Sequence, residues 1–271
     1  MKTRLVQVCA LWLFMFVSPL SVAKKPVTFT FGVVPQQTAV RMAKTWVPFT
    51  KYLKKKTGYS FRFATAKNIS AFKEALDGGA YDFGYMNPYQ YISNSGSGKY
   101  QAFAHARDKQ IKGIIVTHKN GIVRSLKDIH NEKIAFPSKV AFGATTIVLA
   151  DLKRHGIKTK PAYVSSHDSV FQNVAKGNFV AGAGVNRTFA AMPAKIRSQL
   201  QILHTTKGYT PHAIAAHARV PAQVVLKVQQ ALIEMEGDED GRALLSKLKI
   251  KGVVTSADSE WDDVRHDFPV K

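Results

Sequence analysis

Residues 27–58 read VTFTFGVVPQQTAVRMAKTWVPFTKYLKKKTG. The β-branched and aromatic residues that alternate over 27–33 predict a strand. After it, a helix is predicted by the spacing of four apolar residues, Met42, Trp46, Phe49 and Leu53. Gly58 ends this helix, and Pro48 inside it lacks a backbone donor, so we expect a kink or a split there. A strand that feeds a helix is the first unit of an α/β fold.

The same alternation continues along the rest of the chain. Strands are predicted over residues 59–64, 81–86, 101–106, 111–117, 133–136, 162–164, 179–183 and 201–205. Helices are predicted over residues 71–76, 87–93, 142–154, 169–175, 187–191, 224–235, 240–247 and 259–266. We therefore expect an α/β fold with mostly parallel sheets. The C-terminal helices return to the first unit, so lobe 1 is predicted over residues 24–117 and 208–271, and lobe 2 over residues 118–207.

The composition indicates a folded protein with anionic partners. The chain has 271 residues, 45% of them hydrophobic, which is enough to bury a core in one or two domains. Lysines and arginines number 39 against 18 aspartates and glutamates, a formal net charge of +21 that favours anionic ligands or surfaces. Cys9 is the one cysteine, which excludes an intramolecular disulfide and a zinc site built from cysteines.

The first residues have the pattern of a secretory signal peptide. Lys2 and Arg4 precede a mostly apolar run over residues 5–20, and small residues at Ser21 and Ala23 suit a cleavage site. An uncleaved membrane anchor is the alternative, but the run is shorter than the roughly 20 apolar residues that a span requires. We expect cleavage after Ala23 and export to the periplasm, which leaves 271 − 23 = 248 residues and a charge of +21 − 2 = +19.

Motifs of enzymes, cofactors and metal sites are not completed in this sequence. Ser93–Tyr100 lacks the residues of a phosphate-binding loop, and Gly182-Ala183-Gly184 lacks the third glycine of a dinucleotide fingerprint. There is no nucleophile elbow. The nine histidines are scattered, so no metal site is expected. Basic residues are spread along the chain without interleaved aromatics, which disfavours nucleic acid. We expect no cofactor and no catalysis.

Polar residues follow several predicted strands, at the start of the next helix, where open α/β sheets bind ligands. Unpaired backbone N–H groups and the helix dipole attract negative charge there. The candidate ligand-binding residues of these turns are Gln36, Gln37, Tyr85, Asn87, Tyr89, Ser138, His167, Asn186 and Arg187. Other roles remain open: helix capping for Ser138 and Asn87, core packing for the tyrosines, and exposure to solvent for Arg187. A functional His167 would donate a hydrogen bond to an oxyanion.

Six segments are most informative when they are taken in order: Phe31–Pro35, Trp46-Val47-Pro48, Gly78–Tyr85, Ser125–Ile129, Ser166–Ser169 and the strand and turn over Phe179–Arg187. In this order they resemble the phosphate, phosphite and phosphonate-binding family of periplasmic substrate-binding proteins of ABC transporters. The similarity spans nearly the whole exported chain.

The resemblance implies a type 2 periplasmic-binding fold, in which two α/β lobes joined by two crossover strands close on a ligand. It implies first-lobe contacts from Tyr85, Asn87 and Tyr89, and second-lobe contacts from the turn over Pro137–Gly143, His167 and the Asn186-Arg187 turn. Phosphonate-binding relatives tend to have a hydroxyl-rich turn where this chain has Ser138–Gly143. Fewer hydroxyls there remove oxyanion donors. Phe142 and Gly143 remain candidates, with Phe142 either lining a more apolar pocket or packing in the core.

We therefore expect a monomeric periplasmic solute-binding protein that captures a small anion and delivers it to a membrane permease. A ligand sensor that signals to a membrane-bound kinase or cyclase is the alternative. A third hypothesis is an exported hydrolase with His167 as the base and Asp168 as its orienting partner, but no positioned nucleophile accompanies them. The positive charge would steer anions, form a solvated coat, or hold the protein near anionic lipids.

Overall fold

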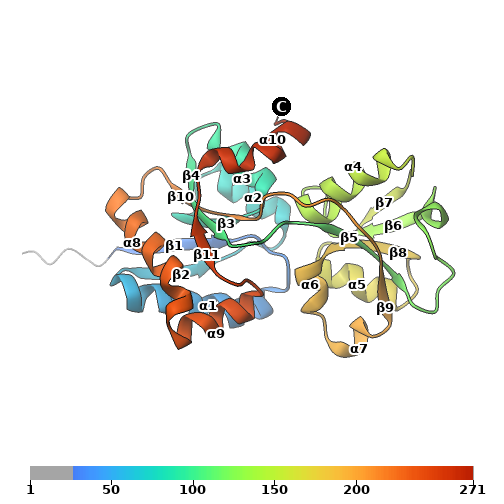
Figure 1. The fold of residues 1–271 in the computed structure, drawn as a ribbon, viewed down its shortest axis with the longest axis horizontal. Helices are drawn as coiled ribbons and strands as arrows, with labels where there is room; N and C mark the ends of the chain where they lie inside the picture. The colour runs from blue at the N-terminus through green and yellow to red at the C-terminus, as the bar shows by residue number, and fades with distance from the viewer. Residues whose placement is uncertain (1–26, 271) are drawn as a thin grey trace, which may run out of the picture.

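The computed structural model of the protein describes residues 27–270, so the predicted signal peptide and its cleavage site lie outside the described residues. Two β-sheets lie side by side along the long axis of the molecule, each with its own helices (Figure 1). We call the six-stranded sheet with its helices the first lobe and the five-stranded sheet with its helices the second lobe. No helix within residues 27–270 is long and apolar enough to cross a bilayer.

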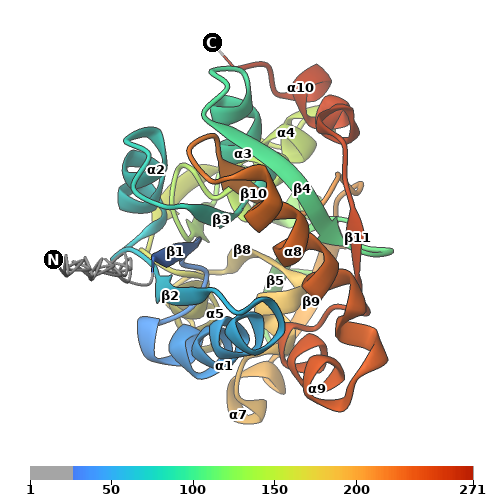
Figure 2. The same cartoon turned by 90° about the vertical axis from the view of Figure 1, so that its left-hand side faces the viewer.

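The first lobe holds both ends of the described chain. Its sheet has the strand order β11-β4-β10-β3-β1-β2. The strands are β1 (Thr28–Val33), β2 (Ser60–Ala64), β3 (Phe83–Met86), β4 (Tyr100–Ala106), β10 (Ala213–His217) and β11 (Val253–Thr255). The helices are α1 (Ala39–Thr57), α2 (Ile69–Asp77), α3 (Pro88–Ser95), α8 (Ala222–Ile233), α9 (Glu239–Leu248) and α10 (Asp262–Asp267). Helices α1, α8 and α9 pack on one face of the sheet, whereas α2, α3 and α10 lie on the other (Figure 2).

The second lobe is formed by the middle of the chain, with the strand order β7-β6-β8-β5-β9. The strands are β5 (Gly113–His118), β6 (Lys133–Phe136), β7 (Lys160–Tyr163), β8 (Ala181–Val185) and β9 (Leu200–Thr205). The helices are α4 (Ile147–Arg154), α5 (His167–Ala175), α6 (Asn186–Ala190) and α7 (Ala194–Arg197). Neighbouring residues of β5 face opposite sides: Ile115 packs in the cluster with α4, and Ile114 packs in the cluster with α5. The central strands of the sheet are therefore buried on both faces, whereas the edge strands β7 and β9 are mostly half-buried or exposed.

Both sheets are mixed, which corrects the expectation of mostly parallel sheets. Strands β1, β2 and β3 pair in parallel, as do β6, β7 and β8. Strands β4, β10 and β11 of the first lobe and β5 and β9 of the second pair antiparallel to their neighbours. The physical reason is that the chain crosses between the sheets twice: in each sheet one crossing strand, β10 or β5, runs against the parallel strand beside it, and the other, β4 or β9, pairs antiparallel to that crossing strand.

Residues 107–112 and 206–212 carry the chain between the two sheets (Figure 1). Strand β5 begins at Gly113, whereas the sequence places the start of the second lobe at residue 118. The strand 111–117 predicted from its apolar run therefore belongs to the second sheet. We keep the division into two lobes as a proposal, with its first boundary moved into 107–112.

Helix α1 shows how the opening sequence forms its local structure. Its apolar face buries Trp46, Phe49 and Leu53 against β1, and Phe31 of that strand lies 5.4 Å from Phe49 between ring centroids. The helix ends at Gly58 with a φ of 78°, where the Gly58 N–H donates to Lys54 O. Pro48 lies inside an unbroken helix, so the split that it suggested does not occur.

Several other element boundaries differ from those predicted. Helix α2 starts at Ile69 because Asn68 caps it by accepting from Ala71 N, whereas Ser70 was the expected cap. The helix predicted over residues 142–154 begins with one π turn over Phe142–Thr146 before α4. Strand β11 has three residues and was not predicted. A strand this short carries too little alternation to be recognised in the sequence.

Candidate functional site

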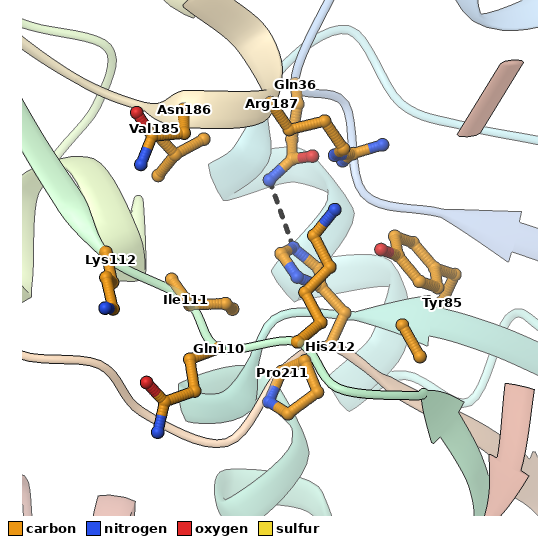
Figure 3. A pocket seen from close by; sticks show the side chains of 12 residues that line it. Gln36, Tyr85, Gln110, Ile111, Lys112, Val185, Asn186, Arg187, Pro211 and His212 are labelled. Carbon is orange, nitrogen blue, oxygen red and sulfur yellow. Dashed lines mark hydrogen bonds between the residues drawn. The ribbon is translucent and has the colours of Figure 1, made fainter. Parts of the chain in front are cut away.

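Two adjoining cavities lie between the first and second lobes. The larger, drawn in Figure 3, has a volume of about 120 Å³, and the smaller has a volume of about 10 Å³. Both are lined by Gln36, Ile111, Val185 and His212. Gln36 follows β1 of the first lobe, Val185 ends β8 of the second lobe, and the other two belong to the crossing segments. The cavities therefore lie where the two lobes meet.

The polar turns predicted from the sequence converge on these cavities. The first-lobe turns contribute Gln36, Tyr85 and Asn87. The second-lobe turns contribute His167, Asn186 and Arg187, and the segment after Ser138 contributes Ala141, Phe142 and Gly143. Each turn joins the end of a strand to the start of a helix, so several helix N-termini surround one small space.

Three cationic side chains line the larger cavity, and no carboxylate lines either cavity. Lys109 and Lys112 come from the first crossing segment, and Arg187 comes from α6. Among residues 27–270, no ion pair joins any of the three to an aspartate or glutamate. Burial, together with the charge of Arg187, lowers the pKa of Lys109 to about 8. Lys109 Nζ also donates to the main-chain oxygen of Lys249, so a neutral carbonyl engages it and the cavity keeps a net positive charge.

His212 is held between an amide and an aromatic ring. Its ring stacks on Tyr85 with centroids 4.8 Å apart and an interplanar angle of 8°, and its Nε2 lies 3.0 Å from Gln36 Nε2 (Figure 3). Burial and the charges of Arg187 and Lys109 hold the pKa of His212 well below its usual value. The Gln36 Oε1 atom is buried without a hydrogen-bond partner in the described chain. One face of the cavity is therefore polar but neutral.

His167 lies at the start of α5 in the smaller cavity and is buried. Burial, with a contribution from Arg187, lowers its pKa to about 3, so the ring is neutral at physiological pH. Thr188 Oγ1 donates to Val185 O at 2.9 Å, and His167 Nδ1 lies 3.3 Å from the same hydroxyl oxygen. Since the hydroxyl proton is engaged, Thr188 accepts from Nδ1–H, and the neutral ring then has no proton on Nε2. This tautomer leaves His167 an acceptor, whereas the sequence suggested a donor.

Backbone geometry brings the second-lobe turns close to the cavity. Ser165 has a φ of 75°, a left-handed conformation that is uncommon outside glycine, and it precedes the Ser166 cap of α5. Gly143 faces Val185 and Ile111 so closely that a Cβ atom there would lie 2.7 and 2.8 Å from their side chains. A residue larger than glycine at position 143 would push these neighbours apart, so Gly143 has a steric role at the cavity wall.

The two lobes also touch outside the cavities. Arg41 of α1 pairs with Asp168 of α5 at 3.0 Å, and it also donates to the main-chain oxygen of Ala191. The Asp168 carboxylate is almost fully buried, with 7% of its side chain exposed, against 33% for Arg41. On the other side, Asn87 Nδ2 donates to Val140 O at 3.4 Å. These contacts connect the lobes in the conformation described.

Three of the predicted site residues do not line either cavity. Gln37 is half-buried and lines neither cavity. Tyr89 stacks on Phe142, with the ring centroids 6.5 Å apart. The Ser138 hydroxyl is buried without a hydrogen-bond partner in residues 27–270. Phe142 touches the smaller cavity but packs mainly against Tyr209 and Phe268. Core packing therefore accounts for most of the surface of Phe142.

Sequence reasoning missed the residues that the crossing segments supply. Lys109, Lys112 and His212 lie in stretches without regular secondary structure, and no motif marks them. His212 is one of the scattered histidines, to which the sequence assigns no role. The available signal was indirect: a polar segment that joins two predicted lobes faces the space between them.

The chain matches one protein family and is similar in fold to several solved structures. A family model described as "ABC transporter, phosphonate, periplasmic substrate-binding protein" matches residues 31–261. PhnD1 from Prochlorococcus marinus, solved in complex with methylphosphonate, has a TM-score of 0.81 at 17% identity, over 90% of this chain and 97% of that chain. A binding protein component of an ABC phosphonate transporter from Pseudomonas aeruginosa has a TM-score of 0.80 at 12% identity, over 90% and 86%.

A third similar structure is that of a protein described as binding aliphatic sulphonates. The periplasmic aliphatic sulphonate binding protein SsuA from Escherichia coli has a TM-score of 0.60 at 18% identity, over 89% of this chain and 85% of that chain. At these identities the three structures are similar to this chain in fold. The architecture is that of a type 2 periplasmic-binding protein, as the resemblance in sequence implied.

The neutral state of His167 predicts a pH dependence of stability. Its pKa is about 3 when folded and about 6.5 when unfolded, so unfolding takes up a proton as pH falls below about 6.5. Between pH 7 and pH 5 the wild type should therefore lose about 2 kcal/mol more unfolding free energy than His167→Gln. Urea unfolding at both pH values measures the difference. His130→Gln, at an exposed histidine, is the matched control, and equal losses in wild type and His167→Gln would contradict the prediction.

Proposed function

The chain belongs to the phosphonate family of periplasmic substrate-binding proteins of ABC transporters, and on that premise we propose that its interlobe cavities enclose a small oxyanion. The observation that carries the proposal is the cation set of Lys109, Lys112 and Arg187, which faces a cavity without a carboxylate. Lys109 and Arg187 are half-buried and Lys112 is exposed, so the positive charge at the cavity is only partly screened by solvent and attracts an opposite charge. A bound anion supplies that charge, and the surrounding helix N-termini add to its stabilisation.

The size and lining of the cavity favour one class of oxyanion. A volume of about 120 Å³ is below the roughly 300 Å³ of pockets that hold drug-sized ligands, so a ligand of a few non-hydrogen atoms fits. Ile111, Val185 and Pro211 give the wall an apolar part that suits a short alkyl substituent. An ammonium group would find no carboxylate in the lining. We therefore propose an alkylphosphonate or a similar oxyanion without an amine.

The neutral residues of the site suit a partly protonated oxyanion. Nε2 of His167 is free to accept the O–H of a monoprotonated phosphonate, while the cations bind its charged oxygens. Rotating the Gln36 amide by 180° would let its oxygen accept a hydrogen bond from the His212 Nε2–H group and would turn its NH2 group to the ligand. Of the residues predicted from the sequence, we keep Gln36, Tyr85, Asn87, Gly143, His167, Asn186 and Arg187 as candidate contacts.

We infer that the ligand is captured by rotation of the two lobes about residues 107–112 and 206–212. The lobes meet through Arg41 and Asp168 on one side of the cavities, which suits a closed state. Opening separates first-lobe residues such as Tyr85 from second-lobe residues such as Arg187, and closing brings them together around the ligand. Binding energy and closure are then linked, because the ligand contacts both lobes only when they are closed.

Family membership supports the transport role over the sensory alternative. The protein is a periplasmic substrate-binding component, so an ABC transporter permease is its membrane partner. We propose further that it acts as a monomer, binds no nucleic acid, and is exported with cleavage after Ala23. Binding and release are its whole chemistry, since its family consists of binding proteins and Asp168, the partner of the hydrolase hypothesis, pairs with Arg41.

The missing carboxylate predicts a preference that calorimetry can measure with a matched pair of ligands. Ethylphosphonate should bind at least tenfold more tightly than 2-aminoethylphosphonate, because the ammonium would be desolvated beside three cations. Arg187→Gln should weaken the binding of ethylphosphonate about tenfold or more, because one charge-assisted hydrogen bond is lost. Arg62→Gln, at an exposed arginine of β2, should leave binding unchanged. Equal or tighter binding of the aminoalkyl compound would refute the proposed ligand class.

Lys109 predicts how affinity changes in mildly alkaline solution. Its pKa is about 8 in the free protein and rises when an anion binds. The affinity for the anion is therefore highest below about pH 8, where Lys109 is protonated, and falls as pH increases above that value. The expected weakening is up to tenfold per pH unit between about pH 8 and pH 9. Lys109→Arg keeps its charge over this range and corrects for ionisation of the ligand itself. Identical pH profiles for wild type and Lys109→Arg would show that Lys109 does not contact the anion.

The Arg41–Asp168 pair predicts an effect on lobe closure without any contact to the ligand. Arg41→Gln should weaken ligand binding about fivefold, since a partly exposed ion pair contributes roughly 1 kcal/mol. Small-angle X-ray scattering should show a larger radius of gyration for this variant at subsaturating ligand. Arg62→Gln again serves as the control. Unchanged affinity and scattering would mean that the pair has no part in closure.

A further inference from the structure

A second cluster of titratable side chains lies in the second lobe, outside both cavities. Asp151 is on α4, His155 follows the helix by one residue, and His204 is on β9. One possible ligand atom from each residue lies within 4.8 Å of the others. None of the three lines the interlobe cavities. The cluster is therefore separate from the proposed oxyanion site.

Two imidazole rings face the same carboxylate oxygen. Asp151 Oδ2 lies 2.6 Å from His204 Nε2 and 3.7 Å from His155 Nδ1. The centroids of the two rings are 5.4 Å apart at an interplanar angle of 76°. Asp151 and His155 are four residues apart at the end of one helix, which puts their side chains on the same face. An Asp-His pair at this spacing, with a third ligand from a strand, is a chelating arrangement.

The surrounding hydrogen bonds fix two of the three groups. Arg154 donates to Asp151 Oδ1 at 2.8 Å, which leaves Oδ2 to face the two histidines. His155 Nδ1 lies 2.9 Å from the main-chain oxygen of Asp151 and 3.7 Å from Asp151 Oδ2, so Nδ1 is the ring nitrogen on the side of the carboxylate. A cation bound by Nδ1 would replace this main-chain hydrogen bond, and the ring proton would then lie on Nε2.

The exposure of the cluster suits an ion that enters from solvent. The Asp151 side chain is 8% exposed and His204 21%, whereas His155 is 49% exposed. The carboxylate is thus buried beside two rings, and the half-exposed His155 ring leaves one side of the cluster open to solvent. Water can complete the coordination on the open side.

We propose that Asp151, His155 and His204 form a binding site for a late first-row divalent cation of the zinc, nickel or copper class. Two imidazoles and one carboxylate are the ligands that these cations prefer, whereas calcium and magnesium prefer oxygen alone. The cation displaces the proton that His204 and Asp151 share and joins α4 to β9. The two histidines are separated by 204 − 155 = 49 residues, which is why their spacing in the sequence gave no indication of a site.

Cobalt provides a direct test, because its visible absorption reports coordination by nitrogen and oxygen ligands. We expect the exported chain, residues 24–271, which contains no cysteine, to bind one Co²⁺ and to lose it to added Zn²⁺. His204→Ala and His155→Ala should each weaken the affinity at least tenfold. His130→Ala, at an exposed histidine outside the cluster, should bind as the parent chain does.

Comparing the two histidine variants separates the loss of a metal ligand from the loss of folded structure as the cause of weaker Co²⁺ binding. His155 is half-exposed at the end of its helix, so His155→Ala should keep the parent's circular dichroism and its oxyanion binding even if His204→Ala unfolds. Absence of Co²⁺ binding by the parent chain would overturn the proposal. Equal affinity in the parent and His155→Ala would overturn it as well, by showing that any bound metal lies elsewhere.

Discussion

A short antiparallel bridge between the two crossing segments determines how the rest of the structure is arranged. Ile111 N donates to Tyr209 O at 2.8 Å, and Tyr209 N donates to Ile111 O at 3.0 Å. Because both crossings are tied at this point, β4, by which the chain leaves the first sheet, pairs antiparallel with β10, by which it returns, and β5 pairs antiparallel with β9 in the same way in the second sheet. The sheets are mixed for this reason. The same two segments place Lys109, Lys112 and His212 between the lobes.

The charges around the cavities follow from which acids are engaged elsewhere. Asp168 is adjacent in sequence to His167, yet its carboxylate pairs with Arg41. The buried histidines stay neutral, because their pKa values are lowered by burial and by the positive charge of Arg187. What remains facing the cavity is cationic or neutral. A site with this balance selects for negative charge before any directed hydrogen bond is considered.

Much of the fold could be predicted from the sequence, because local patterns determine it. The strand over residues 27–33 and the helix after it, the capping of α3 by Asn87 and the polar turns all depend on neighbouring residues. Strand direction could not be predicted, because it depends on crossings that join distant segments. Lys109 and His212 were missed for the same reason, since they become site residues only when the two crossing segments pair. Tyr89 and Ser138 lie in a predicted turn region, but their side chains point into packing that no local pattern reveals.

In the capture by lobe closure that we propose, two electrostatic terms oppose each other. Outside the cavities, the Arg41–Asp168 pair favours the closed conformation. Inside, closure brings Arg187 of the second lobe toward Lys109, and the lowered pKa of Lys109 records this repulsion together with burial. An anion between the two cations turns the internal term from repulsive to attractive, whereas a neutral molecule of the same shape leaves it repulsive. The closed conformation is therefore stabilised by the charge of the ligand as well as by its fit. A permease that recognises the closed form would then receive anion-loaded protein selectively.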